Sequence, residues 1–435
     1  GGAADICVLS IRDFRGRIIP STPPCRKRHT LKPFFSRRIE AAPEAAMKLL
    51  STRLLTPGPT PIPDRVRLAM AEPMIHHRKP DFVAVMDETQ DMLRRLFGTE
   101  QVVLPLSCSG TGAMTAAVHC LFEKGERVLV AEAGKFGERW AEIAATRGLD
   151  VAILSAPWGS AIAPERVTDA LDADPSIRGV LIQLSETSTG VQHPVREIAE
   201  QTRNRDVMLV ADGISSVGIA PTPMDEWGVD CLITGSQKGL MVPPGLSLLA
   251  FSARAWKRAE GVAPSCFYFN LLKEKATLLS RSQTMFTSPV SLIIGLREAL
   301  RMIFEAGLPA LYARQRGLTA MARAGISAMG LELFAPEHYT LGLTSVKMPE
   351  GLASSAVTKK AAELGVIMST GQAPMKEETL RLAHMGWVDW ADILAGLHAL
   401  QWAVESLTGR KLSAGALDAA MAAWHESMKE CRTNP

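Results

Sequence analysis

The sequence has no uninterrupted apolar run of about 18 residues, the length that a membrane-spanning helix requires. Its seven cysteines are odd in number and scattered, with neither a Cys-x-x-Cys pair nor a Cys/His cluster at zinc-site spacing. These absences argue against a membrane protein, a disulfide framework and a metal centre, and they favour a reducing, cytoplasmic location. The composition, 47% hydrophobic and 21% charged, excludes wholesale disorder.

A strong charge of either sign is also missing, because 48 Lys and Arg stand against 45 Asp and Glu, a net charge of +3. Residues 1–46 hold nine basic and four acidic residues, a net charge of +5 (9 − 4). Residues 47–435 hold the remaining 39 basic and 41 acidic residues, a net charge of −2 (39 − 41). Without a basic stripe, this larger part is not expected to bind nucleic acid.

Residues 1–46 form a basic leader that contains five prolines and no sustained periodicity, and the first methionine is Met47. We expect an artificial extension or a start assigned too far upstream, with Met47 as the native start. A targeting segment is an alternative. A nucleic-acid-binding arm is the least favoured, because no aromatic platform accompanies the charges. We expect four parts: the leader 1–46, an N-terminal arm 47–68, a large domain 69–306 and a small C-terminal domain 307–435.

From about residue 100, short apolar strands alternate with amphipathic helices. We expect strands over 101–107, 127–132, 150–154, 178–184, 207–212, 229–234 and 246–251, and helices over 111–124, 136–147, 164–172 and 195–205. Such strands predict an α/β fold with a mostly parallel central sheet flanked by helices. After about residue 305, helices and a few strands, at 339–348 and 380–385, predict a smaller α+β domain.

Polar residues gather where the predicted strands end, which is where open α/β sheets bind ligands. The first strand is followed by SCSGTGA (107–113), a small, hydroxyl-rich loop that opens a helix and suits an anion such as phosphate. Asp212 ends one strand, and Lys238 follows another. A phosphate cradle, a carboxylate and an amine are what pyridoxal 5′-phosphate needs.

From about Leu54 to its C-terminus, the sequence resembles the class V (fold type I) pyridoxal-phosphate aminotransferases, especially the alanine–glyoxylate and serine–glyoxylate or serine–pyruvate branch. The matching motifs are TPGPTPIP (56–63), SCSGTGAM (107–114), SETSTGV (185–191), VADGISSVG (210–218) and TGSQKGLMVPPGLSLL (234–249). They match in order and spacing, including the 26-residue step from Asp212 to Lys238 (238 − 212). The resemblance implies the pyridoxal-phosphate transferase fold of type I.

The resemblance also implies the roles of single residues. Lys238 would bind pyridoxal phosphate as a Schiff base and carry the proton between the substrate Cα and the cofactor, and Asp212 would pair with the pyridine nitrogen. The other expected cofactor-binding residues are Ser109, Gly110, Thr111 and Gln237 at the phosphate, Phe136 stacked on the ring, and Thr187 near the 3′ oxygen.

Arg381 would grip the substrate α-carboxylate, and Gly58 would lie where a small substrate is accepted. Members of the family are homodimers with shared active sites, and Thr287 matches a phosphate ligand supplied by the partner subunit. Thr284 stands where the alanine–glyoxylate branch often has a tyrosine that contacts the phosphate, which puts that contact in doubt.

The expected activity is transamination between a small amino acid, alanine or serine, and a small 2-oxo acid, glyoxylate or pyruvate. Transamination of a phosphonate or of ureidoglycine stays open, because those enzymes share the same motifs. Cysteine desulfuration is disfavoured, because Gln237 stands where a histidine is usual and residues 300–430 hold no cysteine. A noncatalytic protein of the same fold is disfavoured by the presence of Lys238, Asp212 and Arg381.

Overall fold

The structure is a computed structural model that describes residues 51–433, and these lie within one compact unit, Leu50–Pro435. The leader 1–46 and the start at Met47 lie outside the described residues, so both remain expectations. No helix in the described part of the chain is both long and apolar enough to cross a membrane.

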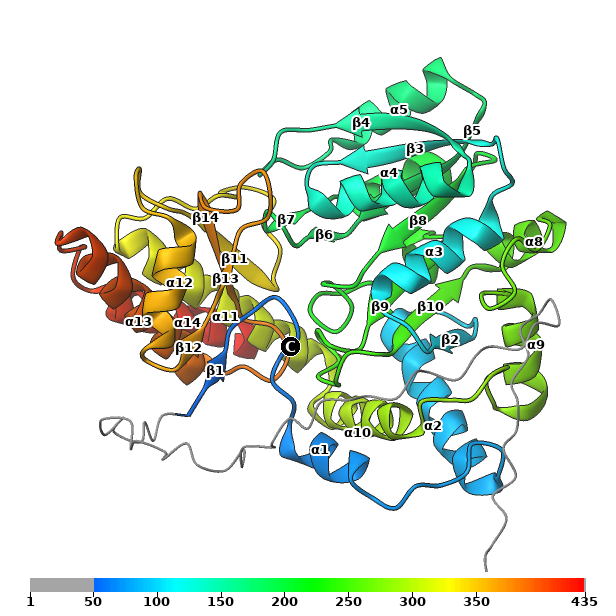
Figure 1. The fold of residues 1–435 in the computed structure, drawn as a ribbon, viewed down its shortest axis with the longest axis horizontal. Coiled ribbons are helices and arrows are strands. Elements are labelled where there is room, and N and C mark those ends of the chain that lie inside the picture. The colour runs from blue at the N-terminus through cyan, green and yellow to red at the C-terminus, as the bar shows by residue number, and fades with distance from the viewer. Residues whose placement is uncertain (1–50, 434–435) are drawn as a thin grey trace, which may run out of the picture. The chain divides into compact units, whose positions relative to one another are not determined.

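A seven-stranded sheet forms the centre of the larger part of this unit (Figure 1). Its strand order is β2-β10-β9-β8-β5-β3-β4. The bounds are Val103–Leu106 (β2), Arg127–Glu132 (β3), Asp150–Ser155 (β4), Ile177–Gln183 (β5), Met208–Asp212 (β8), Cys231–Gly235 (β9) and Ser247–Phe251 (β10). Only β10 runs against its neighbours, β2 and β9. The prediction of a mostly parallel sheet is therefore confirmed.

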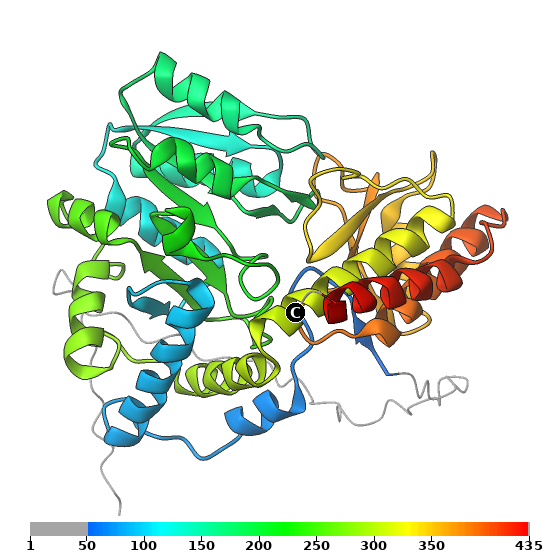
Figure 2. The same cartoon turned by 180° about the vertical axis from the view of Figure 1, so that it is seen from behind.

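Helices cover both faces of this sheet, which is why its central strands read as near-continuous apolar runs. α3 (Gly110–Leu121) and α4 (Lys135–Arg147) pack side by side on one face (Figure 1). α5 (Pro164–Ala173) and α6 (Val195–Thr202) pack on the other face (Figure 2). The remaining elements of this part are α2 (Pro80–Phe97), α7 (Met224–Trp227), α8 (Ala253–Gly261), α9 (Leu271–Arg281), α10 (Val290–Ala306) and the hairpin β6 (Ser185–Glu186) and β7 (Val191–Gln192).

A second, smaller part of the unit, the smaller layer, follows α10 and has its own sheet and helices. Its antiparallel sheet has the order β11-β14-β13, with bounds Leu343–Lys347 (β11), Ser369–Thr370 (β13) and Thr379–Ala383 (β14). Its helices are α11 (Leu308–Ala328), α12 (Ser354–Ala362), α13 (Trp390–Thr408) and α14 (Ala416–Thr433). One hydrophobic cluster runs from Val66 to Ile303, and another joins Leu55 to residues from Leu318 to Ala420. Two cores support the domain limits 69–306 and 307–435, which stay a prediction.

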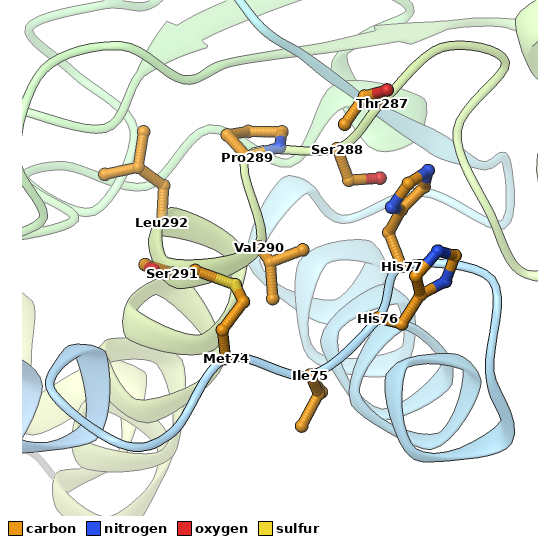
Figure 3. Close-up of a pocket in the computed structure, with 10 residues that line it drawn as sticks. All are labelled: Met74, Ile75, His76, His77, Thr287, Ser288, Pro289, Val290, Ser291 and Leu292. Atoms are coloured by element: carbon orange, nitrogen blue, oxygen red, sulfur yellow. The ribbon is translucent and has the colours of Figure 1, made fainter. Parts of the chain in front are cut away.

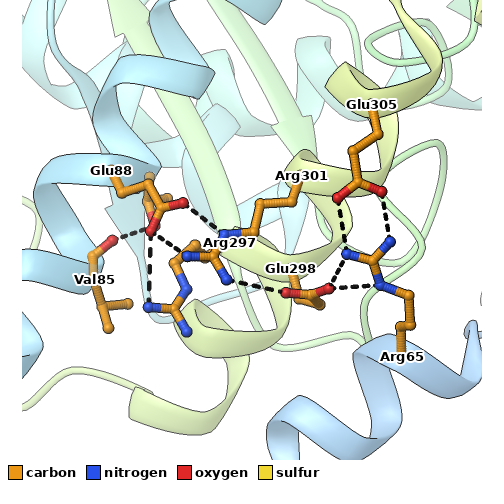
Figure 4. A network of polar contacts seen from close by, with 8 residues as sticks. Arg65, Val85, Glu88, Arg297, Glu298, Arg301 and Glu305 are labelled. Carbon is orange, nitrogen blue, oxygen red and sulfur yellow. Dashed lines mark hydrogen bonds and ion pairs between the residues drawn. The ribbon is translucent and has the colours of Figure 1, made fainter.

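The N-terminal arm links both parts. β1 (Arg53–Leu54) pairs with β12 (Val366–Ile367), and α1 (Asp64–Met70) packs on α10. Arg65 of α1 bonds Glu298 over 2.8 Å and Glu305 over 2.6 Å in an ion-pair network (Figure 4). The segment between β1 and α1 is thus held at both ends, and it passes over the site described next.

Candidate active site

The carboxyl ends of β2, β8 and β9 meet at one edge of the central sheet, because these strands run in the same direction. The loop that opens α3 follows β2, Asp212 ends β8, and Lys238 lies three residues after the end of β9 (238 − 235). The sheet topology therefore brings together three groups that are far apart in the sequence.

The start of α3 presents open backbone donors. Ser109 is the N-cap residue and makes no side-chain capping bond, so the first N–H groups, which include those of Gly110 and Thr111, are available to an anion. A Cβ atom at Gly110 would lie 2.3 Å from Cδ1 of Ile214. The helix start is thus packed directly against the segment that follows Asp212.

Asp212 is only 4% exposed. Its Oδ1 accepts a hydrogen bond of 2.8 Å from the backbone N–H of Ile214. Burial raises the pKa of Asp212 to about 7, and the charge of Glu186 raises it further, whereas Ile214, Lys238 and Arg139 oppose the shift. A cationic partner would stabilise the charged form of this buried carboxylate.

Lys238 lies under the N-terminal arm. Its Nζ donates to the carbonyl of Pro57, and Thr60 Oγ1 donates to the Lys238 carbonyl over 3.0 Å. Burial lowers the pKa of Lys238 to about 8, and the charge of Arg381 lowers it further, while Asp212 opposes the shift. Gly58 has a φ of 136°, and a Cβ atom there would lie 2.6 Å from Nζ. Glycine at this position therefore leaves the space that the amine occupies.

Arg381 lies on β14, between Ser345 of β11 and Ser369 of β13. Its Nε donates to the carbonyl of Thr370 over 2.9 Å, and its Nη1 donates to the carbonyl of Thr187 over 3.1 Å. Nη2 makes no hydrogen bond with residues 51–433. Burial lowers the pKa of Arg381 to about 10, a shift that the charge of Glu186 opposes. A guanidinium held on two nitrogens with a third left open suits a carboxylate ligand.

Phe136 and Thr187 border the same region. Phe136 lies in the first turn of α4, and the guanidinium of Arg139 lies 4.7 Å from the centre of its ring. Arg139 also approaches Thr111 Oγ1, at 3.4 Å from Nη1. Thr187 Oγ1 shares a hydrogen bond of 2.7 Å with Ser215 Oγ. This bond holds the Thr187 hydroxyl against the segment that follows Asp212.

Gln237 and Thr287 occupy different surroundings. The carbonyl of Gln237 accepts a bond of 3.1 Å from the N–H of Thr60, so this residue is part of the site beneath the arm. Thr287 is exposed and lines a pocket of about 620 Å³ together with Met74, His76 and His77 (Figure 3). The single chain thus groups Thr287 with that pocket and not with Lys238.

Thr284 is buried inside its own loop. Its Oγ1 donates to the carbonyl of Phe286 over 2.7 Å and bonds the hydroxyl of Ser288. Arg78 holds the same loop, since it donates to the carbonyls of Thr284 over 2.6 Å and Met285 over 3.0 Å. The threonine therefore stabilises the loop that carries Thr287.

Sequence reasoning missed two charged residues of the site, Glu186 and Arg139. Glu186 is fully buried and influences the pKa values of both Asp212 and Arg381. Its signal was an acidic residue inside the otherwise uncharged segment SETSTG (185–190). Arg139 follows Phe136 by three residues (139 − 136), which places both on one face of a helix.

The groups present fit pyridoxal phosphate. The open start of α3 suits its phosphate, the buried carboxylate of Asp212 suits a protonated pyridine nitrogen, and an amine with a lowered pKa suits its aldehyde. In the part of the chain from 51 to 433, no three or more His, Cys, Asp or Glu residues are grouped so that they could hold a metal ion.

Comparisons with known proteins identify the family of the chain. The family described as "Aminotransferase class-V" matches residues 54–387. The serine–glyoxylate aminotransferase of Methylorubrum extorquens (strain ATCC 14718 / DSM 1338 / JCM 2805 / NCIMB 9133 / AM1) is 34% identical over 79% of this chain and 89% of that protein. A protein named the small subunit of a soluble hydrogenase, from Synechococcus sp. (strain PCC 6716), is also 34% identical, over 83% of this chain and 95% of that protein.

Among solved structures, the ureidoglycine–glyoxylate aminotransferase of Bacillus subtilis has a TM-score of 0.81 and 29% sequence identity, and the match covers 86% of this chain and 98% of that one. The fold of the described residues is thus that of an established structural class. The chain belongs to the class V aminotransferases, which are pyridoxal-phosphate-dependent transferases with the type I fold.

Proposed function

We propose that the protein transfers an amino group between a small amino acid, alanine or serine, and a small 2-oxo acid, glyoxylate or pyruvate. The observation that carries the proposal is the convergence of an amine, a carboxylate and a guanidinium. Arg381 donates to the carbonyl of Thr187, whose hydroxyl bonds Ser215, three residues after Asp212 (215 − 212). The charges of Asp212 and Arg381 also act on the pKa of Lys238, so the three groups share one site. Amino transfer uses all three, which is why we prefer it to the activity in the hydrogenase relative's name.

The cofactor would be held along the edge of the central sheet. Its phosphate would accept from the backbone donors of Ser109, Gly110 and Thr111, with Gln237 close by. Phe136 would cover its ring, Thr187 would lie near its 3′ oxygen, and Asp212 would keep its pyridine nitrogen protonated. Once bound, the cofactor supplies the chemistry by accepting the electron pair that deprotonation leaves on the substrate Cα.

Lys238 would carry the proton. With a pKa of about 8, roughly a tenth of the amines are neutral at pH 7, far more than an unperturbed lysine provides. A neutral amine could take the Cα proton, and the ammonium that results could donate that proton again in the next step. The arm from Pro57 to Thr60 keeps the amine at this place.

Arg381 would orient the substrate. A carboxylate bound at Nη2 is fixed relative to Thr187 and Thr370, which hold the other two nitrogens. Fixing the carboxylate directs the Cα–H bond toward Lys238. Gly58, with no side chain beside Nζ, would leave room for a small substrate.

We further propose a homodimer in which Thr287 of one subunit contacts the phosphate bound by the other. Its exposure, on a loop that Arg78 holds in place, supports this role. The cytoplasmic location inferred from the scattered cysteines also remains a proposal.

A second candidate is the transamination of ureidoglycine, the activity in the name of the Bacillus subtilis structure, or of a phosphonate. These reactions would use the same Lys238, Asp212 and Arg381. Ureidoglycine differs from alanine and serine in its side chain, whereas an aminophosphonate also differs in the acidic group that Arg381 would bind.

The deciding experiment mixes the cofactor-loaded protein with one amino acid at a time and follows the absorbance of the cofactor as it takes up the amino group. Alanine, serine, glutamate, aspartate and ureidoglycine should be compared, and then glyoxylate and pyruvate should be offered as acceptors. We expect rapid conversion by alanine or serine. Conversion by the dicarboxylates alone would contradict the proposed substrate class, and conversion by ureidoglycine alone would favour the second candidate.

A further inference from the structure

Glu186 is a buried carboxylate that takes no part in the proton transfer or in the substrate binding proposed for Lys238 and Arg381. It is 0% exposed, and its two oxygens accept four hydrogen bonds. Oε2 accepts from the backbone N–H groups of Phe136 at 3.0 Å and Gly137 at 3.2 Å. Oε1 accepts from the N–H of Ser188 at 3.0 Å and from its hydroxyl at 2.5 Å. Every partner donates, which is the arrangement that an ionised carboxylate requires.

The first two donors belong to the start of α4. An anion there is stabilised by unpaired N–H groups and by the helix dipole, so Glu186 caps this helix from a distant segment. A second contact reinforces the cap, because the N–H of Lys135 donates to Ser188 Oγ over 3.0 Å. The position of Phe136, in the first turn of α4, therefore depends on the segment 185–190.

The same segment also holds the substrate end of the site. Thr187, the next residue, offers its carbonyl to Nη1 of Arg381, and its hydroxyl bonds Ser215. Glu186 thus lies between Phe136, which would stack on the cofactor ring, and the Thr187 carbonyl, which holds Arg381. The hydrogen bonds of its carboxylate fix the start of α4 relative to the segment that carries Thr187.

Close packing leaves the carboxylate little freedom. A Cβ atom at Gly134 would lie 2.5 Å from Cδ of Glu186 and 2.6 Å from Ser188 Oγ. Gly134 has an extended φ of 167°, which any residue can adopt. An alanine at 134 would therefore press on Glu186 without straining the backbone.

The charge of Glu186 reaches two groups of the site. It raises the pKa of Asp212, which also faces Lys238 and Arg139, and it opposes the loss of the proton from Arg381. Burial raises the pKa of Glu186 itself, while its four donors favour the charged form.

We propose that Glu186 is a positioning residue for amino transfer: it holds Phe136 and the Thr187 carbonyl at a fixed separation, so that cofactor and substrate carboxylate are bound in register. This proposal rests on the proposed function. It concerns the protein's own hydrogen bonds, and it holds for any amino acid whose α-carboxylate binds Arg381.

The test compares E186Q and G134A with the wild-type protein. E186Q keeps one acceptor oxygen for the start of α4 but removes the charge. Its amide N–H₂ would face the N–H of Ser188, so two donors would meet and that hydrogen bond would be lost. G134A keeps the charge and displaces the carboxylate. The matched control is G261A at the end of α8, where an added Cβ meets nothing within 4 Å.

Three quantities should be measured for each variant: the dissociation constant of pyridoxal phosphate, KM for two amino acids with different side chains, and the thermal midpoint with and without cofactor. We expect E186Q and G134A to weaken cofactor binding by about tenfold and to raise both KM values by a common factor, because E186Q removes the charge from these hydrogen bonds and G134A displaces the carboxylate that accepts them. The cofactor should also raise their thermal midpoints less than that of wild type. G261A should match wild type in all three.

Wild-type cofactor affinity and KM in folded E186Q and G134A would overturn the proposal. A lower thermal midpoint alone, with both constants unchanged, would also overturn it, because the role would then be structural only. Failure of the proposed function is a separate result. It would appear in the wild-type protein, as an absence of amino transfer from alanine or serine, whereas the effect on cofactor affinity is measured without turnover.

Discussion

Arg381 donates from Nη1 to the backbone carbonyl of Thr187 over 3.1 Å, although the two residues lie 194 positions apart in the sequence. The bond joins β14 of the smaller layer to the segment that follows β5 of the central sheet. It holds the guanidinium over the edge where Lys238 and Asp212 lie. The affinity that we propose for a substrate carboxylate would therefore depend on the way the two parts of the chain meet.

Arg381→Lys tests this arrangement. Lysine keeps a positive charge but has no planar fork, so it cannot hold Thr187, Thr370 and a substrate carboxylate together. We expect kcat/KM to fall by about 10- to 100-fold, by the same factor for alanine and serine, because the α-carboxylate is common to both. Steady-state kinetics with both amino acids measures this.

The matched control is Arg258→Lys. Arg258 donates to the carbonyl of Leu121 and to Glu126, and none of these belongs to the site. A fall in kcat/KM for only one of the two amino acids would show that Arg381 contacts the side chain and not the carboxylate.

Gly58→Ala should block the amine. The added Cβ would lie 2.6 Å from Lys238 Nζ, in a segment whose φ of 136° already disfavours a side chain. We expect loss of the covalent label that borohydride fixes at Lys238 in cofactor-loaded protein, together with a fall in activity of about 100-fold or more, since the reacting amine is displaced. Peptide mapping locates the label.

Gly125→Ala separates this effect from backbone strain. Gly125 also has a positive φ, 88°, but a Cβ atom there meets nothing within 4 Å. The control should lose some thermal stability and keep full labelling. If Gly58→Ala also kept full labelling, the proposed place of Lys238 under the arm would be wrong.

The sequence was sufficient for the central sheet and for placing charged residues at its edge. Apolar runs such as 127–132 could only be strands buried on two faces, and the structure places β3 at Arg127–Glu132. Asp212 and Lys238 could be assigned because each is a charged residue at a strand end, which is where topology gathers ligand groups.

The contacts of Glu186 and Arg139 could not be predicted in this way. Glu186 caps a helix that begins about 50 residues earlier in the chain, and no local pattern encodes a capping bond at that separation. The four carbonyl and amide contacts of Arg78 with residues 283–286 join residues that lie even further apart, by 205 to 208 positions. Such bonds depend on how the elements pack, which a single sequence does not show.

Asp212→Asn should separate stability from function. The pKa of Asp212 is raised from 3.8 to about 7, so the folded state binds a proton more tightly than the unfolded state between these values. Its contribution to the free energy of unfolding therefore falls as pH rises from about 4 to 7 and stays low above pH 7. Asparagine does not ionise and avoids this loss.

We expect cofactor-free Asp212→Asn to show a thermal midpoint near that of wild type at pH 4 and above it at pH 8, while its affinity for pyridoxal phosphate falls. Asp230→Asn is the control, because Asp230 is a buried carboxylate that accepts from Arg254 Nε over 3.0 Å and from Leu209 N over 2.9 Å. It should lower the midpoint at both pH values. A midpoint of Asp212→Asn below that of wild type at pH 8 would contradict the assigned pKa shift.

Thr287 should act across the subunit interface. Thr287→Glu places a negative charge at the proposed phosphate contact, and Lys238→Ala removes the amine, so each homodimer should be inactive.

If the two residues of one site come from different subunits, a mixed dimer contains one site in which both are wild type. Mixing the variants after mild dissociation should then restore about a quarter of wild-type activity, since half of the dimers are mixed and each has one intact site. If Thr287 instead served the Lys238 of its own chain, an intact site would need both wild-type residues on one subunit. Neither variant subunit has both, so the mixed dimer would then be inactive. The absence of any recovery, with mixed dimers shown by mass spectrometry, would therefore contradict the contact in trans.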